Sequence, residues 1–340
     1  MHSAFRPASL LTSPHAQTLW GPLVRRLPEL PDRRAERMPL DDGDHLWLHH
    51  AGPAPQPGKA RVVILHGLSG CEDSHYARGL QARLADRAIA SVVVCARGTG
   101  GRPNDRARTY HSGETGDPAR ALDFLYRQCP ESPLLVAGFS LGGSQLLNLL
   151  ADREPAGVAA AVAVSVPLRL ARCSDRLNRG ISRLYRNHLI RQLVSGLEQK
   201  KEHLHRVAPE EAARLEALGD LSTIRTFRDF DNRVVAPLHG FRDADDYYSR
   251  CSAGPKLARI RTPTLLLHAL DDPFMVPEVV PPRREISEAV QPEISRHGGH
   301  VGFVTGSPIS PLYWLEERIP AFFSPWLDAE DPASLPASAR

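Results

Sequence analysis

The sequence has few cysteines and no long apolar run. Its cysteines are far apart and odd in number, so neither a disulfide framework nor a CxxC redox or metal site fits them. They are Cys71, Cys95, Cys129, Cys173 and Cys251. Such spacing is typical of free thiols in a reducing compartment, and we expect a cytoplasmic protein. No run approaches the roughly 20 apolar residues of a transmembrane segment, and the first residues lack the charged and apolar regions of a secretory signal.

The sequence also lacks a large excess of charge of either sign, since its net charge is +3 over 340 residues. No aromatic-plus-basic repeat and no zinc-ligand spacing accompanies it, so nothing indicates nucleic-acid binding. The glycine-rich residues 98–101 follow a strand-like run, but Arg102-Pro103-Asn104 do not open a helix as a dinucleotide fingerprint requires. We therefore expect neither a cofactor nor a metal ion.

What the sequence does contain is a series of short apolar, β-branched runs. They cover residues 61–65, 91–95, 134–138, 158–166 and 264–268. Helix-length segments separate the first four runs. Runs that are apolar on both faces and alternate with helices predict an α/β fold with a mostly parallel central sheet between helical layers.

This alternation breaks between residues 168 and 245, where apolar residues recur at near-helical spacing. The pattern predicts a helical cap or lid inserted into one core, which is formed by residues 45–167 and 246–326. Residues 1–44 are rich in proline and arginine and predict an N-terminal arm. Residues 327–340 are polar and predict a flexible tail.

The pattern Gly138-Phe139-Ser140-Leu141-Gly142 lies between an apolar strand and the start of an apolar helix. Its glycines allow a sharp turn that exposes the serine hydroxyl at the edge of the sheet. A neutral serine hydroxyl is a poor nucleophile, and it needs an adjacent base that a carboxylate orients. In this setting the pattern predicts that Ser140 is a nucleophile, the alternative being a structural serine in a tight turn.

The acid and the base should follow in the order Ser, Asp, His, and candidates for both do. Asp271 and Asp272 come after the run 264–268, and His300 lies in a glycine-flanked loop after a short strand-like run. We choose His300 over His297, which we place still in the strand. Asp272 is the preferred acid, and Asp271 stays open as the alternative.

Two backbone N–H groups should stabilise the oxyanion of such a site. One is that of Leu141, directly after the nucleophile. The other is that of Leu68, because the run 61–65 ends in His66-Gly67-Leu68. The ring of His66 is expected to support this loop.

Together these motifs resemble the YheT-like α/β-hydrolases, a group that also includes animal membrane-associated lipases and yeast ethyl-ester synthase/esterases. The resemblance covers about residues 5–325. It depends on Pro14-His15-Ala16-Gln17-Thr18, His66-Gly67-Leu68, Ala96-Arg97-Gly98, His111-Ser112-Gly113-Glu114-Thr115, Gly138 to Gly143, Ile224 to Asp231, Asp271-Asp272-Pro273-Phe274 and His297 to Phe303.

The resemblance implies an α/β-hydrolase fold and a carboxylesterase that hydrolyses esters of short or medium acyl chain through an acyl-enzyme. Ser140, Asp272 and His300 would form its catalytic triad. Two alternatives remain: an acyltransferase or ester synthase with the same triad, and a non-catalytic binding protein on this fold. The expected partner is a small ester or lipid-like molecule.

Segment 168–206 holds ten lysines and arginines against three acidic residues. One interpretation is a cationic lid that attracts acidic substrates or makes transient contact with anionic lipid. The other is a solvated helix face. We favour the solvated face, because the segment lacks the Trp and Phe face that is typical of interfacial helices.

Overall fold

An eight-stranded sheet in the order β1-β2-β4-β3-β5-β6-β7-β8 forms the centre of the molecule. The computed structural model describes residues 3–30 and 32–327, so the predicted tail from residue 328 on lies outside the described residues. β2 pairs antiparallel with β1 and β4, and all other neighbours in the sheet are parallel. The strands are β1 (Arg34–Pro39), β2 (His45–Ala51), β3 (Arg61–Leu65), β4 (Ser91–Cys95), β5 (Leu134–Phe139), β6 (Val158–Val164), β7 (Thr264–Ala269) and β8 (Val290–Ser295).

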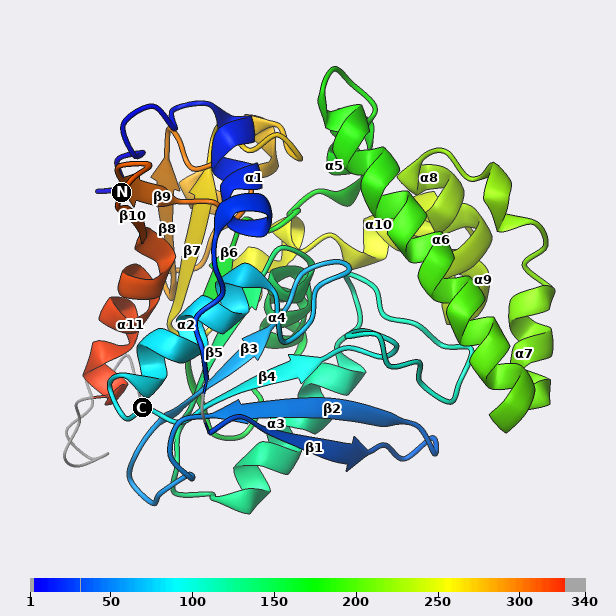
Figure 1. Cartoon of the computed structure of the whole chain (residues 1–340), viewed down its shortest axis with the longest axis horizontal. Coiled ribbons are helices and arrows are strands. Elements are labelled where there is room, and N and C mark those ends of the chain that lie inside the picture. The colour runs from blue at the N-terminus through cyan, green and yellow to red at the C-terminus, as the bar shows by residue number, and fades with distance from the viewer. Residues whose placement is uncertain (1–2, 31, 328–340) are drawn as a thin grey trace.

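Helices cover both faces of this sheet (Figure 1). On one face lie α2 (His75–Ala85) and α11 (Trp314–Leu327), and on the other lie α3 (Gly116–Gln128) and α4 (Leu141–Asp152). Successive strand residues point to opposite faces of the sheet. Val62 and Ile64 therefore pack in the core on the side of α2 and α11, whereas Val63 and Leu65 pack in the core on the side of α3 and α4. The prediction of a mostly parallel sheet between helical layers is confirmed.

The two antiparallel strands and the structure within residues 1–44 were not predicted from the sequence. That range contains helix α1 (Pro14–Val24) and the edge strand β1. Met38 is the only buried residue of β1, so this strand has no apolar alternation that would reveal it. A short two-stranded sheet, β9 (Val304–Gly306) and β10 (Pro311–Tyr313), follows the loop of His300.

Six α-helices between β6 and β7 gather at one end of the molecule (Figure 1). They are α5 (Leu170–Leu177), α6 (Ser182–Val207), α7 (Pro209–Glu216), α8 (Phe227–Phe230), α9 (Ala236–His239) and α10 (Ala244–Cys251). They share a hydrophobic cluster that includes Leu197, Leu215 and Leu238. Tyr247 of α10 belongs to the same cluster, so this helix crosses the predicted boundary between residues 245 and 246. Among the described residues, no helix is long and apolar enough to span a membrane.

Candidate active site

Ser140 occupies the sharp turn between β5 and α4. Its backbone has φ 50° and ψ −114°, in a region that residues with a Cβ rarely adopt. A Cβ on Gly138 would lie 2.7 Å from the carbonyl oxygen of Gly142, and a Cβ on Gly142 would lie 2.4 Å from that of Leu65. Both glycines are therefore required sterically. The N–H of Ser140 donates to the carbonyl of Val164 at 2.8 Å, which fixes the turn against β6.

The structure brings Ser140, His300 and Asp272 into one chain of hydrogen bonds. The Ser140 Oγ lies 2.9 Å from Nε2 of His300, and Nδ1 of His300 lies 2.8 Å from Oδ2 of Asp272. The second oxygen of Asp272 accepts the N–H of Phe274 at 2.8 Å. A carboxylate on Nδ1 selects the tautomer with the proton there. Nε2 is then free to accept the proton of the Ser140 hydroxyl.

Asp271 has a different partner from its neighbour. It accepts the N–H of Gly299 at 2.9 Å, and its other oxygen lies 3.3 Å from Nδ1 of His297. Burial raises the pKa of this carboxyl. β8 ends at Ser295, so His297 lies beyond the strand in which the sequence analysis placed it. Asp271 thus holds the loop that carries His300.

Helix α1 holds the same loop from its other side. Thr18 Oγ1 accepts the N–H of His300 at 2.9 Å. The buried Gln17 side chain donates to the carbonyl of Val304 at 2.9 Å and accepts its N–H at 2.7 Å. A Cβ on Gly302 would lie 2.4 Å from the Gln17 carbonyl oxygen, so glycine permits this close packing. The sequence analysis gave Gln17 and Thr18 no role, although both lie in a motif that carried the family resemblance.

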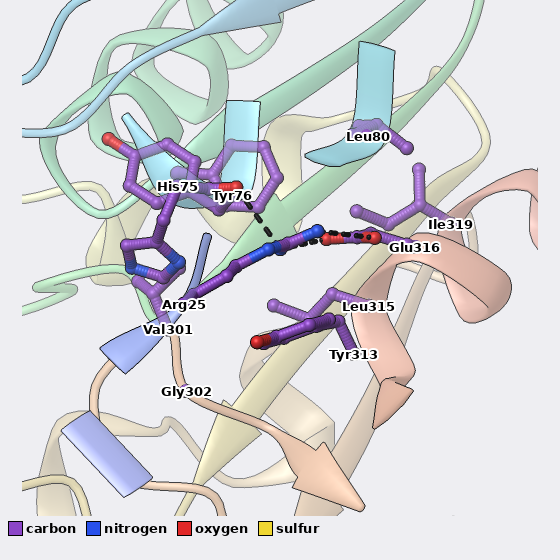
Figure 2. Close-up of a pocket in the computed structure, with 11 residues that line it drawn as sticks. Arg25, His75, Tyr76, Leu80, Val301, Gly302, Tyr313, Leu315, Glu316 and Ile319 are labelled. Atoms are coloured by element: carbon purple, nitrogen blue, oxygen red, sulfur yellow. Dashed lines mark hydrogen bonds and ion pairs between the residues drawn. The ribbon is translucent and has the colours of Figure 1, made fainter. Parts of the chain in front are cut away.

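The end of α1 is anchored in turn by Arg25, which lines a small cavity (Figure 2). Its guanidinium pairs with both carboxylate oxygens of Glu316 on α11, donates to the carbonyl of His75 at 3.2 Å and lies 3.6 Å from the ring centre of Tyr313. Burial, with Arg25 beside it, lowers the pKa of His75 to about 4, which keeps this ring neutral at pH 7. These contacts tie α1, and through it the loop of His300, to the rest of the core.

The loop after β3 is held by two tyrosines. The hydroxyl of Tyr76 accepts the N–H of Gly67, and the hydroxyl of Tyr110 accepts the N–H of Ser69, both at 2.8 Å. Between them, the N–H of Leu68 has no acceptor within the part of the chain that the structure describes. The residues before and after Leu68 are thus held in place, while the N–H of Leu68 itself stays free to donate.

The N–H of Leu141 is a second donor of this kind. It belongs to the first residue of α4, where no helical acceptor precedes it, and it lies at the positive end of the helix dipole. Leu68, Leu141 and Ser140 all line the same cavity. The arrangement can therefore place two N–H donors beside an oxygen bound at the serine.

His66 supports this loop from behind. Its Nδ1 lies 2.8 Å from the carbonyl oxygen of Gly67, and its Nε2 accepts the N–H of Ala96 at 3.0 Å. This pattern selects a neutral ring with the proton on Nδ1. Burial lowers the pKa of His66, which favours the same neutral form. The ring supports this loop and forms no hydrogen bond with the Ser140 side chain.

A cavity of about 1480 Å³ connects Ser140 and His300 with the cap helices. The ring of Phe274 stacks on His300 with centroids 4.1 Å apart, and Tyr185 of α6 lies 5.1 Å from Phe274. α5 and α6 form one wall of this cavity. Between Leu177 and Leu197, most of the side chains that line this wall are apolar. Ser140 therefore faces an extended and mainly apolar space.

Two buried titratable groups interrupt this wall at the cap. The sequence patterns gave neither a functional role, although Lys200 lies in the basic segment 168–206 and Asp231 lies in a motif of the family resemblance. Asp231 accepts the Tyr248 hydroxyl at 2.6 Å, and burial raises its pKa to about 7. Lys200 donates to the carbonyls of Ala107 and Arg108, and burial lowers its pKa to about 7. The cap thus offers one acidic and one basic group, and burial disfavours the charged form of each.

Three groups of side chains within the described ranges could converge on a metal ion. They are His49, Glu72 and Cys95; His111, Glu114 and His239; and Asp44, His45 and Asp105. In each group a carboxylate already pairs with an arginine: Glu72 with Arg33, Glu114 with Arg108, and Asp105 with Arg37. None of the three contains Ser140, Asp272 or His300.

The sheet, the turn at Ser140 and the cavity over it define an α/β hydrolase. A model of the alpha/beta hydrolase fold family matches residues 60–307, and the chain belongs to this family. Within it, the chain is 38% identical over 328 residues to the "Putative esterase YheT" of Escherichia coli, covering 96% of this chain and 94% of the bacterial protein. The chain is thus a YheT-like α/β hydrolase.

More distant relatives extend this picture. The chain is 26% identical over 300 residues to the human protein named Phospholipase ABHD3, covering 85% of this chain and 71% of the human one. The Pyrococcus furiosus esterase Pf2001 has a similar fold, with a TM-score of 0.54 at 15% identity over 87% of this chain and 91% of that chain. The esterase EaEST of Exiguobacterium antarcticum gives 0.53 at 16% identity, with coverage of 87% and 100%.

Proposed function

We propose that the protein is a serine carboxylesterase that hydrolyses esters of short- to medium-chain acyl groups through an acyl-enzyme. The observation that carries this proposal is the continuous hydrogen-bonded chain from Ser140 through His300 to Asp272, with links of 2.9 and 2.8 Å. The names of its relatives, a putative esterase and a phospholipase among them, support ester hydrolysis as the reaction class.

In the acylation step, Ser140 Oγ attacks the ester carbonyl carbon while Nε2 of His300 takes the hydroxyl proton. The carbonyl oxygen gains the negative charge, and the N–H groups of Leu68 and Leu141 stabilise it. One such donor contributes about 2.7–4 kcal/mol in comparable sites. His300 then gives its proton to the leaving alcohol, and the acyl group stays on Ser140.

In the deacylation step, His300 takes a proton from water, which attacks the acyl carbon. The tetrahedral intermediate forms at the same two N–H donors and collapses when His300 returns the proton to Ser140 Oγ. Asp272 keeps the imidazole in the required tautomer and stabilises its cationic form in both steps. No step uses a group outside the chain, the ester and water.

The cavity supports an acyl group longer than acetyl. Its volume of about 1480 Å³ exceeds the roughly 300–1,000 Å³ of ordinary small-ligand pockets. In this proposal residues 168–245 act as a lid, because α6 from this segment closes one side of the cavity. Ser182 Oγ of α6 donates to the carbonyl of Pro273 at 2.6 Å, one residue after Asp272.

The test is labelling with a fluorophosphonate probe, together with hydrolysis of p-nitrophenyl esters of graded chain length. We expect the wild type and Ser310→Ala to be labelled and active, since Ser310 is exposed and does not line the cavity. Ser140→Ala should lose both labelling and hydrolysis while unfolding at the same temperature. Labelling that persists in Ser140→Ala would contradict the proposal. Ester formation in added ethanol at the expense of hydrolysis would identify an acyltransferase instead.

A further inference from the structure

Large apolar side chains are exposed around the mouth of the catalytic cavity. Leu23 is 73% exposed and Leu184 is 67% exposed, although both line the cavity that contains Ser140. The exposed large apolar residues that share this position are Leu19, Leu23, Leu27, Ile181 and Leu184. They come from α1 and the turn after it, and from the start of α6. An apolar rim of this kind marks an interaction surface.

These two groups lie close together although more than 150 residues separate them in the sequence. The Nδ1 of His15 on α1 lies 3.0 Å from the hydroxyl of Tyr185 on α6, and their rings stack with centroids 5.8 Å apart. Figure 1 shows α1 and α5 at the top of the molecule, with the start of α6 following α5, and residues of all three helices line the same cavity. The two groups therefore form one continuous rim, which we call the apolar rim.

A strong positive charge borders the apolar rim. Between residues 172 and 191 the chain has a single acidic residue, Asp175, against Arg172, Arg176, Arg179, Arg183, Arg186 and Arg191. Within the described residues, none of these six arginines forms an ion pair, and those that donate do so to backbone carbonyls or to Asn178 and Asn187. Their charge is thus left for a partner outside the chain.

We propose that the apolar rim and these arginines dock the protein on an anionic phospholipid bilayer, so that an amphiphilic ester passes from the bilayer to Ser140. Leucine and isoleucine side chains would enter the interface while the arginines contact lipid phosphates. The docking itself does not depend on catalysis, whereas the route of the ester depends on the proposed esterase function.

The position of the rim favours a lipid surface over a protein partner. It surrounds the entrance to a cavity with a nucleophile at its base, and a protein seated there would close that entrance. A fluid bilayer covers the rim and supplies the ester through the same opening. The sequence analysis favoured a solvated face because segment 168–206 lacks Trp and Phe. In the structure, exposed leucines of α1 line the same cavity as that segment. They supply apolar side chains, which favours contact with a lipid surface over a solvated face.

Vesicle binding by full-length Ser140→Ala tests the docking without turnover. We expect co-sedimentation with vesicles of equal phosphatidylglycerol and phosphatidylcholine, weak binding to pure phosphatidylcholine, and weaker binding in higher salt. Arg183→Gln with Leu184→Ser should weaken binding about tenfold, because one arginine at an anionic surface contributes about fivefold and the leucine adds to this.

Helix α6 offers a matched control at its opposite end. Arg206 and Val207 are an exposed arginine–aliphatic pair like Arg183 and Leu184, but roughly 35 Å further along the helix at 1.5 Å per residue. Arg206→Gln with Val207→Ser should leave vesicle binding within about twofold. Equal losses in both double variants would overturn the placement at the rim.

Three other results would overturn the proposal: no binding to anionic vesicles, equal binding to neutral ones, or a dimer in solution that only the rim variant dissociates. The last result would assign the rim to a second copy of the chain. Fluorophosphonate labelling of the wild type without lipid separates failure of the docking from failure of the esterase proposal, since labelling needs Ser140 alone.

Discussion

The hydroxyl of Thr18 accepts the backbone N–H of His300 at 2.9 Å, across 282 positions of the chain. The same hydroxyl donates to the carbonyl of Pro14 one helical turn earlier, at 2.7 Å. A Cβ on Gly299 would lie 2.6 Å from that same carbonyl oxygen. Helix α1, which precedes every strand of the sheet, thus fixes the loop that presents the imidazole to Ser140.

Thr18→Ala should lower kcat about tenfold and change KM little, because the His300 loop loses one of its restraints and the imidazole is held less well. Errors of about 1 Å in such positions cost up to a hundredfold in rate. Thr18→Ser, which keeps the hydroxyl, should restore most of the rate. Steady-state kinetics on a p-nitrophenyl ester measures both. An alanine variant with wild-type kcat would show that the other contacts suffice to hold the loop.

The two adjacent aspartates should respond very differently to the same isosteric change. Asp272→Asn replaces the carboxylate 2.8 Å from Nδ1 of His300, and the wrong imidazole tautomer should lower kcat about 10⁴-fold, as in comparable triads. Asp271→Asn keeps an oxygen that can accept the N–H of Gly299, and we expect a loss of less than about tenfold. Single-turnover acylation rates provide the comparison. Similar losses in both variants would contradict the assignment of the catalytic acid to Asp272 alone.

A pair of glycine-to-alanine changes should have opposite effects on stability. A Cβ on Gly142 would lie 2.4 Å from the backbone oxygen of Leu65 and 2.5 Å from that of His66, atoms that the sheet holds in place. We expect Gly142→Ala to destabilise the fold by about 3 kcal/mol or more. Gly196 on α6 has open space around its Cβ position, and Gly196→Ala should stabilise by about 0.5–1 kcal/mol. Urea unfolding monitored by circular dichroism checks both signs.

The strands that the sequence predicted as apolar runs are buried on both faces. β2 is also largely buried, but it was not predicted because three of its seven residues are histidines. Strands β3 to β7 appear as apolar runs because helices cover the sheet on each side. Strand β1 escaped prediction because an exposed edge strand needs only one apolar residue, Met38. Apolar runs therefore reveal strands that are buried on both faces. They do not reveal an exposed edge strand such as β1, which is held mainly by its backbone hydrogen bonds.

In the candidate site, too, some residues could be predicted from local sequence patterns and others could not. Ser140, His300 and Asp272 could be proposed because each lies in a local pattern at the end of a strand. The positioning roles of Thr18 and Gln17 depend on contacts with a loop almost 290 residues away, which no local pattern encodes. Asp231 was missed for a related reason, since only the folded cap buries it beside Tyr248.

Two neutral imidazoles lie together where the core meets the cap. The rings of His111 and His239 have centroids 4.5 Å apart, and Nε2 of His239 lies 2.9 Å from the hydroxyl of Thr109. Burial lowers the pKa of His111 to about 4, and burial together with the neighbouring His111 lowers that of His239 still further. Protonation of either ring is therefore opposed by the folded state.

Stability should consequently fall as the pH drops from about 6.5 towards 4. A histidine whose pKa is lower in the folded state contributes stability above its unfolded pKa of about 6.5, and this contribution is lost as the unfolded chain takes up protons. Each such histidine adds a slope of about 1.4 kcal/mol per pH unit. His239→Gln keeps a polar group beside Thr109. Between pH 7.5 and pH 5, its free energy of unfolding should fall by about 2 kcal/mol less than that of the wild type. Urea unfolding at the two pH values measures the difference, with the exposed His188→Gln as the control. Parallel pH curves for wild type and His239→Gln would show that this ring does not oppose protonation.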